Sequence, residues 1–169
     1  MRLFVAVWPP AEVVDALGKL PRPEQSGVRW TTREQWHVTL RFLGQMADVD
    51  EATRAFARID VDSVGSVFAE MGPATACLGR GVLHVPVRGL DELARATVEA
   101  TAGVGRSPED RSFRGHLTLA RARGGRGDLR RLRGSPLAAS WKVAEVTLVA
   151  STLRRDGSRY EVVASLALA

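Results

Sequence analysis

Apolar and polar residues alternate along several short segments of this chain, a pattern typical of half-buried β-strands. Near the start, Leu3, Val5 and Val7 fall on one face of an extended segment. Asp156-Gly157 lies between the last two apolar segments, and Asp-Gly favours a type I′ hairpin turn. Strands are predicted in this way over 2–7, 28–31, 36–43, 64–71, 82–87, 115–120, 141–151 and 159–168.

Apolar residues three or four positions apart predict a smaller number of helices. Pro9-Pro10 stands where a first helix can begin, Asp48 or Asp50 can cap a second, and Gly103 ends a third. These helices are predicted over 11–20, 51–59 and 91–102, with one further helical turn near 129–132. Such a mixture, closed by a hairpin, indicates an α+β fold with a largely antiparallel sheet. No stretch resembles a linker, so we expect residues 1–169 to form one domain.

Length and composition narrow the class of protein. The chain has 169 residues, of which 45% are hydrophobic and 25% charged, as in an ordinary globular domain. Its single cysteine, Cys77, excludes an intramolecular disulfide and a cysteine-rich zinc site. No apolar run approaches the roughly 18 residues of a membrane span, and the apolar start is too short for a signal peptide. We expect a cytoplasmic monomer.

Basic residues gather in one part of the chain. The net charge is +5, yet residues 106–133 alone hold nine arginines against three acidic residues. The chain has no asparagine and only two lysines, so a GC-rich coding background explains the choice of arginine, but not the clustering. A localised basic field suggests a polyanionic partner such as RNA. The candidate RNA-binding residues are Arg126, Arg130, Arg131 and Arg133.

One tetrapeptide pattern occurs twice. His37-Val38-Thr39-Leu40 is echoed by His116-Leu117-Thr118-Leu119, and both lie in predicted strands. Side chains at positions i and i+2 of a strand point the same way, so each motif presents an imidazole and a hydroxyl opposite its apolar pair. If the two strands lie side by side or across a cleft, two imidazoles and two hydroxyls converge.

Such a convergence suits phosphoryl chemistry near neutral pH. Histidine titrates near pH 6.5, so one ring can take a proton from water while the other gives one to a leaving alkoxide. The hydroxyls of Thr39 and Thr118 can donate hydrogen bonds to the non-bridging phosphate oxygens. Arg121, shortly after the second motif, can add a positive charge to the same anion.

A single H-x-T-L pattern carries little information, because a strand histidine is usually structural. Two copies on predicted strands, in a chain with three histidines, favour catalysis by His37 and His116. The third, His84, alternates with apolar neighbours, and we interpret it as structural. The chain has no paired-carboxylate cluster, H-E-x-x-H, phosphate-binding glycine loop or G-x-S-x-G motif, so we expect no metal and no cofactor.

Taken together, these segments resemble the two-histidine phosphoesterase superfamily, specifically the RNA 2′,3′-cyclic phosphodiesterases first called 2′-5′ RNA ligases. The resemblance covers most of the chain. It lies in the opening strand RLFVAV, the segments WHVTLRFLG and FRGHLTLAR around the two motifs, and the closing segments LVAST and YEVV. Gly115 departs from the pattern, since the family usually has proline before the second histidine.

The resemblance implies a fold of two pseudo-symmetric lobes, each a mainly antiparallel sheet with outer helices, which form a central groove. One H-x-T motif would lie on each wall. It implies that His37 is the acid that protonates the departing ribose oxygen and that His116 is the base that activates water. Thr39, Thr118 and Arg121 would hold the phosphate, without a metal. The substrate would be RNA with a 2′,3′-cyclic phosphate end, opened to a 2′-phosphate.

Three other functions remain open at this stage. The same site can run in reverse and join a cyclic end to a 5′-hydroxyl, or it can act on small cyclic nucleotides or 2′-5′ oligonucleotides. A third possibility, from another class, is a non-catalytic RNA-binding module. It would use the basic segment and stacking on Trp8, Trp30 and Trp36, although we favour core packing as the role of each of these rings.

Overall fold

A computed structural model describes residues 1–124 and 126–169 of the chain. Ten strands lie in this part: β1 Arg2–Val7, β2 Val28–Trp30, β3 Val38–Gln45, β4 Phe68–Met71, β5 Ala76–Leu78, β6 Val82–Arg88, β7 His116–Ala122, β8 Ala139–Lys142, β9 Glu145–Arg154 and β10 Gly157–Ala167. The helices are α1 Ala11–Gly18, α2 Val49–Phe56, α3 Val61–Val64 and α4 Asp91–Thr101, with 3₁₀ turns η1 Arg33–Gln35 and η2 Leu129–Leu132.

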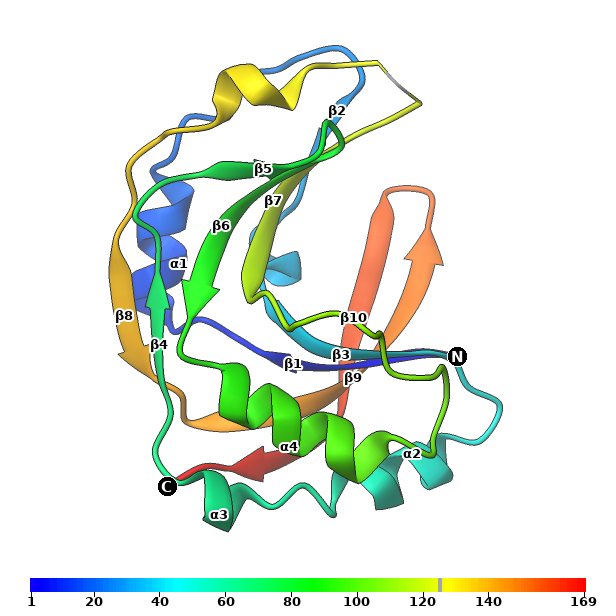
Figure 1. Ribbon diagram of the computed structural model, residues 1–169. Coiled ribbons are helices and arrows are strands. Elements are labelled where there is room, and N and C mark those ends of the chain that lie inside the picture. The colour runs from blue at the N-terminus through cyan, green and yellow to red at the C-terminus, as the bar shows by residue number, and fades with distance from the viewer. Residues whose placement is uncertain (125) are drawn as a thin grey trace.

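The described strands form one curled sheet in the order β10-β9-β1-β3-β7-β6-β4-β8, to which β2 adds beside β7 and β5 beside β6 (Figure 1). Every pairing between these strands is antiparallel. Only one register pair, Val38 with Leu117, joins β3 to β7. The sheet therefore has two halves that meet at this pair, one with β1, β3, β9 and β10 and the other with β2 and β4 to β8.

Helices lie on the outside of this sheet. Figure 1 shows α2, α3 and α4 gathered beneath the first half, and α4 contacts β3 while α1 contacts β8. Their apolar sides and the inward faces of the strands share one core. Its largest fully buried side chains include Trp36, Phe56, Leu17, Leu43, Leu93, Leu117 and Leu148. The predicted α+β class with two lobes of antiparallel sheet and outer helices is confirmed.

Helix caps explain why the predicted strand over 64–71 begins later than expected. Asp48 caps α2 by accepting the Glu51 N–H at 3.1 Å, as predicted for one of the two candidate aspartates. Asp60 does the same for the short helix α3 by accepting the Ser63 N–H at 3.1 Å. The predicted strand over 64–71 therefore begins only at Phe68, because its first residues complete and follow that helix.

The predicted strand over 141–151 is two strands in different halves of the sheet. β8 ends at Lys142 and pairs with β4, whereas β9 begins at Glu145 and pairs with β1. Between them the Val143 N–H donates to Val67 O at 2.8 Å. Periodicity alone does not reveal such a change of partner, because both strands have the same alternation.

The final hairpin is present, but its turn lies one residue earlier than predicted. Arg155 and Asp156 form the two-residue connection, and Gly157 already pairs with Arg154. A type I′ turn needs positive φ at both central residues. In the described chain positive φ occurs only at glycines, here at Gly157 with φ 127°, so the predicted type I′ turn at Asp156-Gly157 is wrong.

A buried arginine connects the first half of the sheet to α4. Arg41 lies on β3 and is 6% exposed. Its Nε donates to Thr101 Oγ1 at 2.8 Å, and its Nη2 donates to the carbonyls of Thr101 at 3.2 Å and Arg106 at 2.8 Å. It thus satisfies carbonyls at the C-terminal end of α4 and fixes the start of the segment that leads to β7.

Candidate active site

The two H-x-T motifs meet at the junction of the sheet halves. Val38 and Leu117, the central residues of the motifs, are register partners on antiparallel strands. This register sets His37 beside Thr118 and His116 beside Thr39, related by a local two-fold axis. The apolar residues of both motifs are buried, and the histidines and threonines are half-buried on the opposite face, as predicted. The histidines are diagonal neighbours, which in such a pair lie about 7–8 Å apart.

His37 lies in an aromatic enclosure. Its ring stacks on Phe4 with centroids 4.8 Å apart, and the rings of Trp8 and Tyr160 lie at 5.3 Å and 5.2 Å. The Nδ1–H donates to Gln35 O at 2.7 Å, which leaves Nε2 to accept from the Thr39 hydroxyl at 3.0 Å.

The same enclosure controls the charge of His37. Burial is the main cause that lowers the pKa of His37 to about 4, with a smaller contribution from the positive charges of Arg121 and His116 and against the Gln35 carbonyl, which raises it. In the free protein at neutral pH the ring is therefore uncharged. A ring that acts as an acid needs a proton, so this electrostatic environment opposes the role that the resemblance gives to His37 until an anion is bound.

His116 is held by the chain that precedes it. Its Nδ1–H donates to Arg114 O at 2.8 Å, which directs Nε2 away from the backbone. Gly115 packs tightly on β6: the Val87 N–H donates to Gly115 O at 2.9 Å, and a Cβ at position 115 would lie 2.2 Å from Val87 O. The residue that departs from the family pattern is thus required by a close approach of two backbones.

A β-bulge in β7 brings Arg121 to the histidines. Leu83 pairs with Ala120, but the next residue of β6 pairs with Thr118, so Leu119 is an extra residue. Arg121 follows His116 by five residues, so strict alternation along β7 would place the two side chains on opposite faces. The extra residue places the Arg121 side chain on the same face as His116, where it lies close enough to lower the pKa of His37.

Two functional candidates were not found from the sequence. Arg29 on β2 is the register partner of Arg121, and its Nη2 donates to Asp156 O at 2.6 Å, which joins β2 to the β9–β10 hairpin. Tyr160 contacts His37 from β10, the edge strand of the other half. Arg29 belongs to no motif, and Tyr160 lies in the YEVV segment, which carries no sign of a catalytic role. Only the register of distant strands places the two residues at the site.

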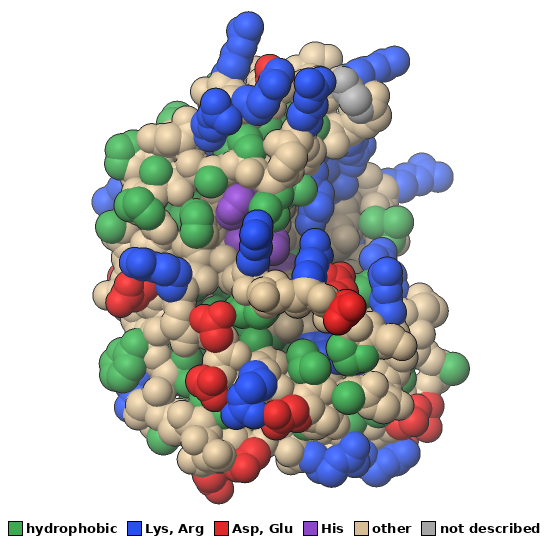
Figure 2. All heavy atoms as spheres, in the orientation of Figure 1, with side chains coloured by type: hydrophobic (Ala, Val, Ile, Leu, Met, Phe, Trp, Pro, Cys, Tyr) green, Lys and Arg blue, Asp and Glu red, His purple; other side chains and the backbone are tan. Residues whose placement is uncertain are grey.

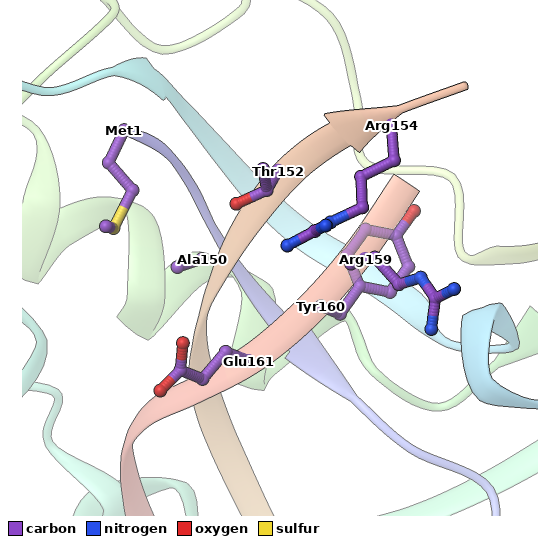
Figure 3. Close-up of a pocket in the computed structure, with 7 residues that line it drawn as sticks. All are labelled: Met1, Ala150, Thr152, Arg154, Arg159, Tyr160 and Glu161. Carbon is purple, nitrogen blue, oxygen red and sulfur yellow. The ribbon is translucent and has the colours of Figure 1, made fainter. Parts of the chain in front are cut away.

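Two hollows are lined in part by Tyr160, and neither is lined by the histidines or threonines of the motifs. One has a volume of about 460 Å³ and is shown in Figure 3, where Arg154 and Arg159 lie beside the Tyr160 ring. The other has a volume of about 340 Å³ and is lined by Trp8, Glu34, Glu145, Thr147, Tyr160 and Val162. Among the three tryptophans considered for stacking, Trp8 is therefore beside the site, whereas Trp36 is 1% exposed and belongs to the core.

The two ends of the basic segment, residues 106–133, lie against different halves of the sheet. The Arg106 N–H donates to Leu43 O at the end of β3, whereas the Arg123 N–H donates to Gly27 O in the other half. Arg130 is held by Asp128 at 3.0 Å, an interaction that lowers the pKa of Asp128 to about 2. All four candidate RNA-binding arginines are exposed, and they are Arg126, Arg130, Arg131 and Arg133. Figure 2 shows basic side chains gathered at one end of the face on which histidines are visible.

In residues 1–124 and 126–169, no group of three or more histidine, cysteine, aspartate or glutamate side chains is arranged to hold a metal ion. No helix in the same part of the chain has the length and apolar character needed to span a membrane.

Comparison with known proteins gives consistent matches. The sequence profile of the family described as "LigT like Phosphoesterase" matches residues 7–69, which include the first motif. An RNA 2′,3′-cyclic phosphodiesterase of Aeropyrum pernix is 30% identical over 145 residues, covering 76% of this chain and 79% of that protein. A protein of the same name from Geobacillus stearothermophilus is 28% identical, over 98% of this chain and 56% of its own length. The crystal structure of TT0787 of Thermus thermophilus superposes with a TM-score of 0.81 at 26% identity, covering 99% of this chain and 98% of that one.

Proposed function

This chain belongs to the LigT-like phosphoesterase family, and on that premise we propose that it hydrolyses the 2′,3′-cyclic phosphate end of RNA to a 2′-phosphomonoester. The observation that carries the proposal is the Val38–Leu117 pairing, which sets two imidazoles and two hydroxyls on one face. The relatives named RNA 2′,3′-cyclic phosphodiesterase support the substrate class.

In the proposed reaction the phosphate lies between the two motifs. The hydroxyls of Thr39 and Thr118 and the guanidinium of Arg121 hold its non-bridging oxygens, where charge builds in the transition state. His116 takes a proton from water through Nε2, and the water oxygen bonds to phosphorus. The bond from phosphorus to O3′ breaks, and His37 gives its Nε2 proton to O3′. One water is consumed, and the two rings return to their starting states by exchange with solvent.

His37, the proposed acid, becomes protonated when the substrate binds. In the free protein the pKa of His37 is about 4, mainly because of burial among aromatic rings. The cyclic phosphate brings a negative charge that offsets the positive field of Arg121. The same aromatic rings that exclude water strengthen attraction between this charge and the imidazolium. Binding the anion therefore raises the pKa of His37 and loads the acid.

The face that carries the motifs also suits an RNA strand. The exposed arginines Arg126, Arg131 and Arg133 provide cations, and the hollow of about 340 Å³ beside Trp8 and Tyr160 provides room for a base or ribose. Ligation of a cyclic end to a 5′-hydroxyl would use the same residues with acid and base exchanged. Water at high concentration favours opening over ligation.

The test is release of phosphomonoester from an oligoribonucleotide that ends in a 2′,3′-cyclic phosphate, in EDTA and without nucleotide. We expect a 2′-phosphate product, and a loss of about 10²–10⁴-fold for His37→Ala and for His116→Ala in variants that melt cooperatively. A requirement for divalent metal or ATP, or two variants with near wild-type rates, would contradict the proposal. RNA binding without turnover would favour the non-catalytic module.

A further inference from the structure

His84, which the sequence suggested was a structural residue, lies in the active-site face of the sheet. His84 is the register partner of Thr118, in regular register with the Val85–Leu117 and Pro86–His116 pairs, so the two side chains share a face. On β6 it alternates with the core residues Leu83 and Val85. The pairing of β6 with β7 thus brings this imidazole to the second H-x-T motif.

The ring of His84 contacts the ring of His116. Their centroids are 5.3 Å apart, and the planes are nearly perpendicular at 75°. His84 is 7% exposed, and its Nδ1 is buried without a hydrogen-bond partner. By contrast, the Nδ1 atoms of His37 and His116 each meet a backbone carbonyl, which fixes the tautomer. His84 lacks that constraint at Nδ1.

An unpartnered buried nitrogen is costly, and packing alone does not require it. A phenylalanine would fill a similar space against His116 without burying a polar atom. The presence of imidazole at this position therefore points to use of a ring nitrogen during the reaction, when the charge of His116 changes.

The surroundings of His84 favour its uncharged form. Burial lowers the pKa of His84, and the positive charge of His116 lowers it further. The register partners of His84 are Thr118 on β7 and Ala76 on β5, so among these contacts His116 is the one titratable group. A neutral ring can accept a hydrogen bond from an imidazolium, whereas a second cation would repel it.

We propose that His84 is a positioning residue for His116: its neutral ring holds the His116 ring in the groove, and a ring nitrogen accepts a hydrogen bond from the imidazolium that His116 becomes. The inference rests on the proposed role of His116 as the base. Since the free Nδ1 leaves the tautomer of His84 unconstrained there, the ring can present an unprotonated nitrogen when His116 gains the water proton.

His84→Phe tests the nitrogen while keeping a ring. We expect kcat on the cyclic end to fall by about 10- to 100-fold, the value of a hydrogen bond to a charged group, with KM little changed. His84→Asn and His84→Gln, whose amides lie near Nδ1 and Nε2 respectively, should show which nitrogen acts by partial recovery of kcat. Trp141→Phe is the matched control, because Trp141 Nε1 is also buried and unpartnered but lies on β8, three strands from β7.

The second readout does not depend on turnover. In NMR titrations of the three histidines, we expect the midpoint of His116 to move down in His84→Phe and to stay in place in Trp141→Phe. Wild-type kcat and an unmoved His116 midpoint in His84→Phe would overturn the inference and make His84 a packing residue. If the wild-type protein does not hydrolyse the cyclic end, the proposed function fails, while the titration still decides whether His84 stabilises protonated His116. If His84→Phe does not fold, the same titration of His84→Gln decides.

Discussion

Replacing His37 by alanine removes the group that we assign as the acid, and the cost depends on whether the leaving oxygen needs a proton. With a pKa of about 4, only about one His37 ring in a thousand is protonated at pH 7 in the free protein. Raising this pKa to about 7 takes about 4 kcal/mol of attraction between imidazolium and bound phosphate. Two unit charges about 4 Å apart near a protein surface supply about 4 kcal/mol, so one phosphate anion is sufficient.

The assay compares two substrates. On an ordinary 2′,3′-cyclic end, we expect His37→Ala to lose about 10²–10⁴-fold in rate. A cyclic-phosphate analogue that expels a nitrophenolate or thiolate needs no proton, so the same variant should come within about tenfold of wild type. The loss in His116→Ala should remain, because water still needs its base. With the analogue the fall of kcat at alkaline pH should disappear, since that fall reports loss of the proton from the acid.

Two results would refute this reasoning in different ways. If the analogue rescues His116→Ala in place of His37→Ala, then His37 is the base, as its uncharged state in the free protein suggests, and the roles are exchanged. If the analogue rescues neither variant, the histidines act by binding the phosphate rather than by transferring protons. Titration of His37 by NMR with and without inorganic phosphate provides the control, since the midpoint should rise on binding.

Three further outcomes follow from the charges. Because folding lowers the pKa of His37, the unfolded chain binds more protons than the folded chain between about pH 6.5 and 4, so the free energy of unfolding should fall as the pH falls through that window. In urea denaturation measured over this pH range, His37→Phe should show a smaller dependence of the free energy of unfolding on pH. An unchanged dependence would contradict the burial argument. Arg41→Met should cost about 2–4 kcal/mol, because it removes the donors to Thr101 Oγ1 and to the carbonyls of Thr101 and Arg106. A Tm within 1–2 °C of wild type, roughly the change expected for less than 1 kcal/mol, would show that water replaces them. Replacing the exposed arginines Arg126, Arg131 and Arg133 with glutamine should reduce the slope of log K against log salt for single-stranded RNA by roughly 0.7 per lost phosphate contact. Hydrolysis of a cyclic mononucleotide should not slow. An unchanged slope would leave coding bias as the explanation for the arginines.

Alternation along single strands was enough to predict the geometry of each motif. His37 with Thr39, and His116 with Thr118, lie on one face because the period of a strand is two residues and both strands bury their apolar side. The repeat of the pattern pointed to a convergence of these faces, and the Val38–Leu117 pair supplies it.

Features that depend on pairing between distant strands were not predictable in this way. The bulge at Leu119 decides the face of Arg121, yet its only sign in β7 is the consecutive apolar pair Leu119-Ala120, which alternation alone does not identify as a bulge. The position of His84 beside the second motif depends on the pairing of β6 with β7. The aromatic enclosure of His37 comes from β1, the segment after it and β10, so no local window contains it. For the same reason the lowered pKa of His37, which constrains the mechanism most, could not be derived from composition or spacing.

The local two-fold axis through the Val38–Leu117 pair has a consequence for the product. Two motifs related by such an axis do not by themselves fix the orientation of a bound cyclic phosphate. Turning the phosphate end for end would exchange the ester oxygen, O2′ or O3′, that faces each histidine. The orientation must be set by residues that break the symmetry, which are the rings of Phe4, Trp8 and Tyr160 around His37 and His84 beside His116. In the proposed reaction, the residues that hold the nucleoside therefore decide whether the phosphate stays on O2′ or on O3′, and we expect that changes to these residues can invert the regiochemistry while both histidines stay in place.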